Sequence, residues 1–164
     1  HGGRDRYVVT GETGCLVRGQ LPPWEMLDVK YSMGSSIGIA SGMQRAGIPH
    51  QPVVLSGDSA FLHNGFGELI DAVRSGRDLL VIILDNNVTA LTGGQPHPAT
   101  QQVSSRGPST QVNLESLIRA AGVEWLRLVD PRDEVQLKMA LEVGLQAAGV
   151  RVILSRSPCV LYTA

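Results

Sequence analysis

Two hydrophobic patterns alternate along the chain. Short apolar runs predict five strands, at residues 7–10, 53–56, 79–84, 125–129 and 150–155. Between them, apolar side chains recur at helical spacing in three stripes, at Phe66 to Val73, Leu114 to Ala121 and Leu137 to Ala148. Strands that alternate with helices indicate an α/β fold. We therefore expect a single three-layer domain, with a mainly parallel sheet and helices on both faces.

Two helix starts carry capping signals. Asn113 can cap the second stripe, and Asp130, followed by Pro131, is the predicted N-cap of the third. A further helix should begin near Gly34, in "MGSSIGIASGMQRAG". Each glycine inside a helix costs about 1 kcal/mol relative to alanine. These glycines therefore indicate close approach by a ligand or another chain, or tight packing of the helix on the sheet.

The segment from Thr92 to Thr110 has no hydrophobic period. It is rich in glycine, proline, serine and threonine, which predicts a long loop. Loops of this length often serve as lids or binding loops.

Oxygen-bearing side chains follow two of the predicted strands. Asp58 and Asn86 lie 28 positions apart, about one strand-to-strand repeat, and parallel strands end at the same edge of a sheet. We therefore expect the two side chains to meet and to suit Mg²⁺. Gly65 and Gly67, at the expected start of the Phe66 helix, would add free N–H groups at that edge. A diphosphate bridged by Mg²⁺ fits this arrangement.

At these residues the sequence resembles a known family. "GDS" (Gly57 to Ser59), followed by "DNN" (Asp85 to Asn87), is similar to the thiamine diphosphate motif. "LDNNVTALTGGQPHP" resembles the thiamine-diphosphate domain of 2-oxoacid:ferredoxin oxidoreductases and is most similar to the indolepyruvate branch. "TGETGCL" and "MGSSIGIASG" extend the resemblance to roughly residues 8 to 160. It implies a single thiamine-diphosphate-binding (PP-type) domain over residues 1–164.

The resemblance also implies a set of site residues. Mg²⁺ would be bound by the side chains of Asp58 and Asn86 and by the carbonyl of Val88. The remaining cofactor contacts would be Gly57, Ser59 and Thr92 at the diphosphate, and Gly14, Cys15, Gly34, Ser35 and Ser36 near the two rings. Ser59 stands where the family motif has glycine, but it keeps the N–H group and adds a hydroxyl.

Four further residues are candidates for contact with the substrate or cofactor, or for a place in the loop. Leu91 is apolar where pyruvate-using relatives carry a polar residue, which favours a bulky or aromatic 2-oxoacid. His63 can position substrate or diphosphate, or be a hydrogen-bonded loop residue. His97, between two prolines, is predicted to be a surface or lid residue. Cys15 either contacts the cofactor or is a small buried hydrophobic residue.

Composition limits the number of domains, the classes of partner and the expected cellular compartment. A length of 164 residues suits one domain, and a net charge of −1 without basic clusters disfavours nucleic acid and membrane as partners. Cys15 and Cys159 cannot supply the four thiolates of an iron-sulfur cluster, and they favour a reducing, cytoplasmic setting. The chain begins at His1 rather than methionine, so it can be a piece of a larger protein.

The resemblance implies several partners. A pyrimidine-binding domain or subunit would supply the activating glutamate, since nothing assigns that role to Glu12. A ferredoxin or iron-sulfur domain would take the electrons, and 2-oxoacid and CoA would be the substrates of a homo- or hetero-oligomer. Two alternatives stay open: the cofactor subunit of a non-oxidative sulfopyruvate- or phosphonopyruvate-type decarboxylase, and a non-catalytic binding module.

Overall fold

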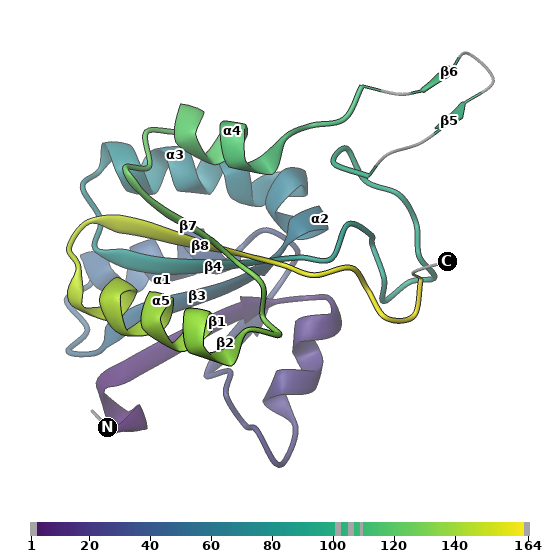
Figure 1. Cartoon of the computed structure of the whole chain (residues 1–164). Coiled ribbons are helices and arrows are strands. Elements are labelled where there is room, and N and C mark those ends of the chain that lie inside the picture. Colours follow the sequence, from purple (N-terminus) through teal and green to yellow (C-terminus); the bar gives the residue numbers. More distant parts are fainter. Residues whose placement is uncertain (1–2, 101–102, 105–106, 109, 163–164) are drawn as a thin grey trace.

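Six parallel strands form one sheet in the order β2-β1-β3-β4-β8-β7 (Figure 1). The computed structural model describes residues 3–100, 103–104, 107–108 and 110–162. The strands are β1 (Tyr7–Glu12), β2 (Val29–Tyr31), β3 (Gln51–Gly57), β4 (Leu79–Asp85), β7 (Trp125–Val129) and β8 (Val150–Arg156). All five predicted strands are present. β2 was not predicted, because three residues are too few to show a period.

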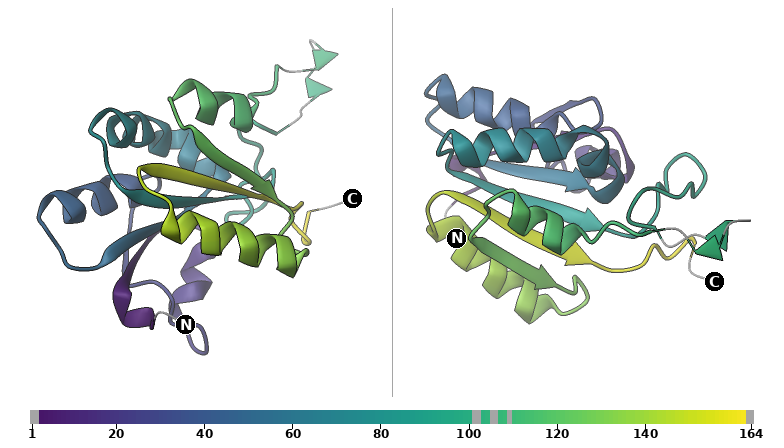
Figure 2. Two further views of the ribbon diagram at one scale, coloured as in Figure 1. Left: turned by 60° about the vertical axis from the view of Figure 1, so that its left-hand side comes forward. Right: turned by 90° about the horizontal axis from the view of Figure 1, so that it is seen from above.

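Helices cover both faces of the sheet, as predicted (Figure 2). α1 (Ser36–Arg45), α3 (Phe66–Arg74) and α4 (Leu114–Ala120) pack on one face, where Val81 and Ile83 of β4 point. α5 (Glu134–Gln146) packs on the other, against Leu80 and Ile82. Because β4 is covered on both faces, its sequence is an unbroken apolar run rather than an alternating one.

The two predicted helix caps had different outcomes. Asn113 caps α4 as predicted, because its side chain accepts a hydrogen bond from the Ser116 N–H at 2.8 Å. The prediction for Asp130 was wrong: Asp133 caps α5, accepting from the Gln136 N–H at 3.0 Å. The Asp130 carboxylate instead accepts hydrogen bonds from the side chain and N–H of Arg132, which lower the pKa of Asp130 to about 2.

The helix expected to start near Phe66 begins earlier. Three segments follow one another without a break: α2 (Asp58–Ala60), the π-helical turn η3 (Phe61–Gly65) and α3. Gly65 is therefore buried inside a helical run, and the helix N-terminus at the sheet edge belongs to Gly57 and Asp58. The expectation that Gly65 and Gly67 open the helix was wrong, since a π-turn carries the helix through them.

The glycine just before α1 is explained by tight packing between helices. Gly34 has a φ of 77°, and a Cβ added there would lie 2.6 Å from the Cβ of Asn64. A Cβ on Gly38 would come within 2.5 Å of the Glu68 carboxylate on α3. A side chain at Gly34 would also meet the backbone of Gly65 and Ala60, so α1 could not start this close to the helical run that begins at Asp58, whereas at Gly38 the flexible Glu68 side chain can move aside. Of the two expected explanations, close packing holds here, although the neighbour is a helix rather than the sheet.

The segment after β4 contains more structure than a plain loop. An isolated antiparallel bridge joins Thr89 to Gln95, and β5 (Val103–Ser104) pairs with β6 (Gly107–Pro108) in a small ladder that projects from the sheet edge (Figure 1). The rest of the predicted loop includes residues 101–102, 105–106 and 109, which lie outside the described residues. Short 3-10 turns, η1 (Arg4–Arg6) and η2 (Cys15–Gln20), flank β1. In the described part of the chain, no helix is long and apolar enough to cross a membrane.

Candidate functional site

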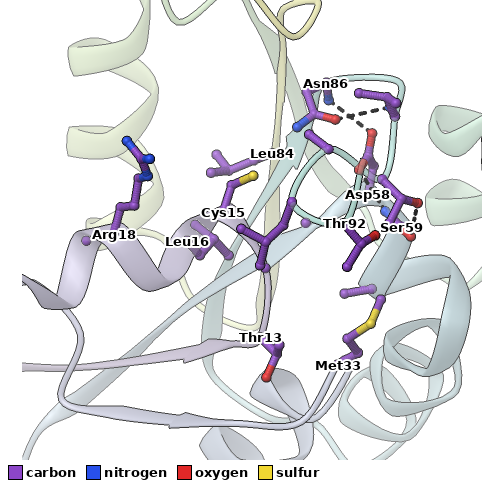
Figure 3. Close-up of a pocket in the computed structure, with 18 of the residues that line it drawn as sticks. Thr13, Cys15, Leu16, Arg18, Met33, Asp58, Ser59, Leu84, Asn86 and Thr92 are labelled. Atoms are coloured by element: carbon purple, nitrogen blue, oxygen red, sulfur yellow. Dashed lines mark hydrogen bonds between the residues drawn. The ribbon is translucent and has the colours of Figure 1, made fainter. Parts of the chain in front are cut away.

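A pocket of about 390 Å³ opens at the carboxyl edge of the sheet (Figure 3). Its walls come from the η2 segment after β1, from the turn after β3 and from the turn after β4. These strands are neighbours, with β3 between β1 and β4, so their ends converge. The lining residues are Thr13, Gly14, Cys15, Leu16, Arg18, Gly19, Trp24, Met26, Met33, Gly57, Asp58, Ser59, Ala60, Leu84, Asn86, Val88, Thr89, Ala90, Leu91 and Thr92.

The structure brings Asp58 to the strand end that carries Asn86, as their spacing predicted, although the printed contact is with the backbone of Asn86 rather than its side chain. Asp58 is 2% exposed, and its Oδ2 accepts hydrogen bonds from the backbone N–H groups of Asn86 (3.0 Å) and Asn87 (2.7 Å). Its Oδ1 accepts from the N–H of Ser59 at 2.7 Å. The amide oxygen of Asn86 accepts from the Val88 N–H at 3.1 Å. The carboxylate therefore fixes the turn that follows β4.

Local conformation explains the second of the two asparagines in this turn. Asn87 has a φ of 64°, a left-handed conformation that asparagine tolerates better than most residues. Asp85, the last residue of β4, does not line the pocket. Its Oδ2 accepts a hydrogen bond from Nε of Arg156, at the end of the adjacent strand β8, at 2.6 Å. The chain thus turns sharply after Asp85 and presents Asn86 to Asp58.

His97 is part of this site, which corrects the prediction that it is a surface residue. It is 9% exposed, and its Nε2 lies 3.1 Å from Oδ2 of Asp58. The pattern of prolines around His97 indicated an exposed loop, but the turn from His97 to Thr100 folds back onto the end of β4. Thr100 donates its hydroxyl to the carbonyl of Asn87 at 2.8 Å. Nothing in the sequence signals this long-range contact.

Glu12 connects two segments of the chain at the same edge of the sheet. It is fully buried, and its two carboxylate oxygens accept four hydrogen bonds between 2.6 and 3.1 Å. Two donors, the Ser56 hydroxyl and the Gly57 N–H, belong to β3; the other two, the Gly34 N–H and the Ser36 hydroxyl, belong to the start of α1. Burial raises the pKa of Glu12, and these hydrogen bonds offset only part of the rise.

The rest of the pocket wall is mainly apolar. Leu16 and Leu84 lie on either side of Cys15, while Asp58, Ser59 and Thr92 gather at one side of the view and Arg18 lies at the other (Figure 3). Trp24 and Leu91 line the pocket although they are 67% and 55% exposed. The pocket therefore has a buried polar end and an open apolar end.

Most of the predicted site residues line this pocket. Those that do are Gly14, Cys15, Gly57, Asp58, Ser59, Asn86, Val88, Leu91 and Thr92. Cys15 is exposed, so the alternative of a small buried hydrophobic residue is wrong. The structure does not bring Gly34, Ser35 and Ser36 into the wall: Gly34 and Ser36 donate hydrogen bonds to Glu12, and Ser35 donates to the Ser32 carbonyl. His63 is exposed on η3 and does not line the pocket either.

Sequence reasoning missed one wall of the pocket. Arg18, Trp24 and Met26 come from a segment with no strand or helix period and outside the quoted motifs, while Met33 stands at the edge of "MGSSIGIASG" and was not singled out. Thr89 was also missed: its hydroxyl lies 2.8 Å from that of Ser59.

The polar end can hold a hard cation through oxygen atoms. Oδ1 of Asp58 and the amide oxygen of Asn86 each accept one hydrogen bond within the protein, which leaves each of them a free lone pair. Within the described residues, no three His, Cys, Asp or Glu side chains are placed to hold a metal ion together. A cation here would therefore depend on amide, carbonyl and ligand oxygens, the set that suits Mg²⁺.

Comparisons with known proteins show the family and the fold of the chain. The indolepyruvate oxidoreductase subunits IorA of Pyrococcus horikoshii and Methanothermobacter thermautotrophicus are 33% and 34% identical over 96% of this chain. The chain spans about a quarter of their length, 26% and 25%. A solved 2-oxoglutarate:ferredoxin oxidoreductase from Magnetococcus marinus shares the fold, with a TM-score of 0.86 at 18% identity over 97% of this chain and 56% of that one. The model of the thiamine pyrophosphate enzyme C-terminal TPP binding domain matches residues 12–154, and the chain belongs to this family.

Proposed function

We propose that this chain is the thiamine-diphosphate- and Mg²⁺-binding part of a 2-oxoacid:ferredoxin oxidoreductase. The reaction would be the oxidative decarboxylation of an aryl 2-oxoacid, similar to indolepyruvate, to acyl-CoA and CO₂. One observation carries the proposal: Asp58 and Asn86 meet at the polar end of a pocket whose remaining wall is apolar. We also assign residues 1–164 to a single domain of this type.

The residues at the polar end fit the diphosphate and its metal ion. Oδ1 of Asp58, the amide oxygen of Asn86 and the carbonyl of Val88 would bind Mg²⁺, with phosphate and water oxygens as the other ligands. Gly57 and Ser59 would lie beside the diphosphate at the N-terminus of the helical run, where the helix dipole favours an anion and Ser59 offers its hydroxyl. Thr92 lines the same pocket and would supply a hydroxyl.

The apolar end would hold the rings and the substrate. When bound, thiamine diphosphate supplies the nucleophilic carbon and the electron sink for decarboxylation. Cys15 and Gly14 would approach the cofactor from η2, and Leu91 would contact the side chain of the 2-oxoacid. An apolar contact of this kind favours an aryl substrate over pyruvate, although a difference in apolar contact is worth only about 1–3 kcal/mol.

The chain needs partners for turnover. Among the described residues, no glutamate lines the pocket, and the carboxylate of Glu12 is bound by four donors beneath it. We propose that a pyrimidine-binding domain or subunit supplies the activating glutamate in a homo- or hetero-oligomer. Iron-sulfur clusters on another domain or subunit, or a ferredoxin, would take the electrons. Free thiols at Cys15 and Cys159 support a cytoplasmic setting. His63 would act only if a partner brings substrate to it.

A direct assay tests this function. The full-length polypeptide that carries this chain, purified with any subunits that accompany it, is given thiamine diphosphate, Mg²⁺, CoA and a one-electron dye under anaerobic conditions. We expect the dye to be reduced with indolepyruvate or phenylpyruvate, in a manner that depends on CoA, and more slowly with pyruvate. Release of free aldehyde without dye reduction would overturn the oxidative proposal in favour of a simple decarboxylase.

A further inference from the structure

The contact between His97 and Asp58 has a defined direction. The side chains of both residues are only 3% exposed, so water does not compete for the 3.1 Å contact between His97 Nε2 and Asp58 Oδ2. The other ring nitrogen, Nδ1, accepts a hydrogen bond from the Ala99 N–H at 3.2 Å. An accepting Nδ1 carries no proton, so the ring proton lies on Nε2. His97 therefore donates to Asp58.

This donor makes the two oxygens of the carboxylate unequal. Oδ2 accepts three hydrogen bonds, from the N–H groups of Asn86 and Asn87 and from His97. Oδ1 accepts one, from the Ser59 N–H. The torsion that turns a carboxylate has a broad energy minimum, so its orientation depends on such partners. Three donors hold Oδ2 on the protein side and leave Oδ1 as the oxygen with a free lone pair.

The turn that carries His97 is itself fixed to the site. The His97 N–H donates to the hydroxyl of Thr100 at 3.1 Å, and the Thr100 N–H returns a bond to the His97 carbonyl at 2.8 Å. The same hydroxyl donates to the Asn87 carbonyl at 2.8 Å. The ring is thus held on a closed turn bonded to the residues that surround Oδ2, and it has little freedom to leave.

We propose that His97 is a positioning residue of the metal site: it orients the Asp58 carboxylate so that Oδ1 faces the cation, without binding the cation itself. The inference rests on the proposed function, because it assumes a metal ion at Asp58. Groups that hydrogen-bond to a metal ligand typically change metal affinity by about 10- to 100-fold when removed. His97 has the geometry of such a group.

Two substitutions separate this role from simple anchoring of the loop. Asparagine at this position places its oxygen near Nδ1 and can still accept from the Ala99 N–H, but it is too short to reach Asp58. Glutamine places its amide nitrogen near Nε2 and can still donate to Asp58, but it cannot accept from Ala99. A role in orienting the carboxylate predicts that His97→Asn is impaired and His97→Gln is not. A role in anchoring the loop predicts the reverse.

The test measures Mn²⁺ affinity by electron paramagnetic resonance of free Mn²⁺, with saturating thiamine diphosphate and no substrate. It uses the full-length protein with its accompanying subunits. We expect His97→Asn to raise the Kd for Mn²⁺ about 10- to 100-fold, and His97→Gln to stay within about threefold of the unaltered protein. His50→Asn, the same change at an exposed histidine remote from the pocket, is the matched control and should have no effect.

Each outcome decides the matter. Equal Mn²⁺ affinity in His97→Asn and the unaltered protein would overturn the inference, as would a loss in His97→Gln that equals or exceeds the loss in His97→Asn. Either result would leave the proposed function intact. No binding of Mn²⁺ by the unaltered protein, with thiamine diphosphate present, would instead overturn the proposed function and this inference with it. Circular dichroism of each variant shows whether it is folded.

Discussion

The two ends of the pocket are built differently. At the polar end, Asp58, His97 and Glu12 are each less than 10% exposed, and each carboxylate accepts four hydrogen bonds. At the apolar end, Trp24 and Leu91 are more than half exposed, and no side-chain hydrogen bond among the described residues fixes either of them to a neighbouring segment. The polar end is therefore held in place by hydrogen bonds within this chain, whereas the apolar end is exposed.

This contrast indicates which part of the chemistry each end can perform alone. Buried hydrogen-bond networks hold their members in one geometry, which is what a cation and a diphosphate require. Exposed aromatic and aliphatic side chains gain little until another surface covers them. We therefore expect the polar end to govern cofactor affinity, and the apolar end to govern substrate choice and contact with a partner. The following changes test that division.

The largest effect should come from Asp58→Asn. The substitution keeps the shape of the side chain but removes its charge and places an N–H₂ group where N–H donors already converge. We expect the affinity for thiamine diphosphate with Mg²⁺ to fall by about 100-fold or more, beyond the usual cost of losing a group that merely supports a ligand. Isothermal titration measures it. Asp71→Asn, on the exposed face of α3, is the control; unchanged affinity in Asp58→Asn would contradict the assignment.

Glu12→Ala should lower the stability of the protein, because Glu12 connects the end of β3 to the start of α1. The change leaves four buried donors without their acceptor, two of them backbone N–H groups at Gly34 and Gly57. Each buried donor left unpaired costs about 1–3 kcal/mol, and water entering the space recovers part of that. We expect the free energy of unfolding to fall by about 2 kcal/mol or more in urea denaturation. A loss below about 0.5 kcal/mol, the usual range for a surface substitution, would show that Glu12 does not brace the edge.

Leu91→Ser should act on the apolar end alone. Because Leu91 is exposed, the free energy of unfolding should change by less than about 0.5 kcal/mol. The KM for an aryl 2-oxoacid should rise about tenfold, while the KM for pyruvate changes little. Steady-state assays with both substrates measure this. Val135→Ser, at an exposed valine on α5, should change neither value. An equal rise for both substrates would mean that Leu91 does not discriminate between them.

The smallest effect concerns pH. Burial raises the pKa of Glu12 above its ordinary value of 4.5, so the folded protein holds this proton more tightly than the unfolded chain does. The stability linked to the proton is present in full below pH 4.5 and is lost as the pH rises through the folded pKa. Glu12→Gln has no such proton to lose.

The variant and the unaltered protein should therefore diverge with pH. As pH rises from 4.5 to neutrality, the free energy of unfolding of Glu12→Gln should improve relative to that of the unaltered protein. Chemical denaturation at several pH values measures the difference. A shift in the opposite direction would mean that the four hydrogen bonds outweigh burial and that the carboxylate is ionised at a lower pH than in the unfolded chain.

The sequence was sufficient for the parts of the site that depend on local order. The apolar run of β4 and the spacing of Asp58 and Asn86 predicted two adjacent strand ends, because parallel strands allow few other arrangements. The contacts of His97 and Glu12 were out of reach, since no strand repeat links these residues to their partners: His97 and Asp58 are 39 positions apart, and the donors to Glu12 lie 22 to 45 positions from it. The predicted start of the helical run was wrong, because Gly65 indicated a break at a point where a π-turn continues the helix.

A crystal structure of the full-length protein with thiamine diphosphate and Mn²⁺ tests the central claim most directly. The anomalous signal of Mn²⁺ locates the cation without assumptions about the protein. We predict one peak between the diphosphate and the polar end, about 2.2 Å from Oδ1 of Asp58 and the amide oxygen of Asn86, with His97 still bonded to Oδ2. A peak bound by His97, or a diphosphate outside this pocket, would contradict the account.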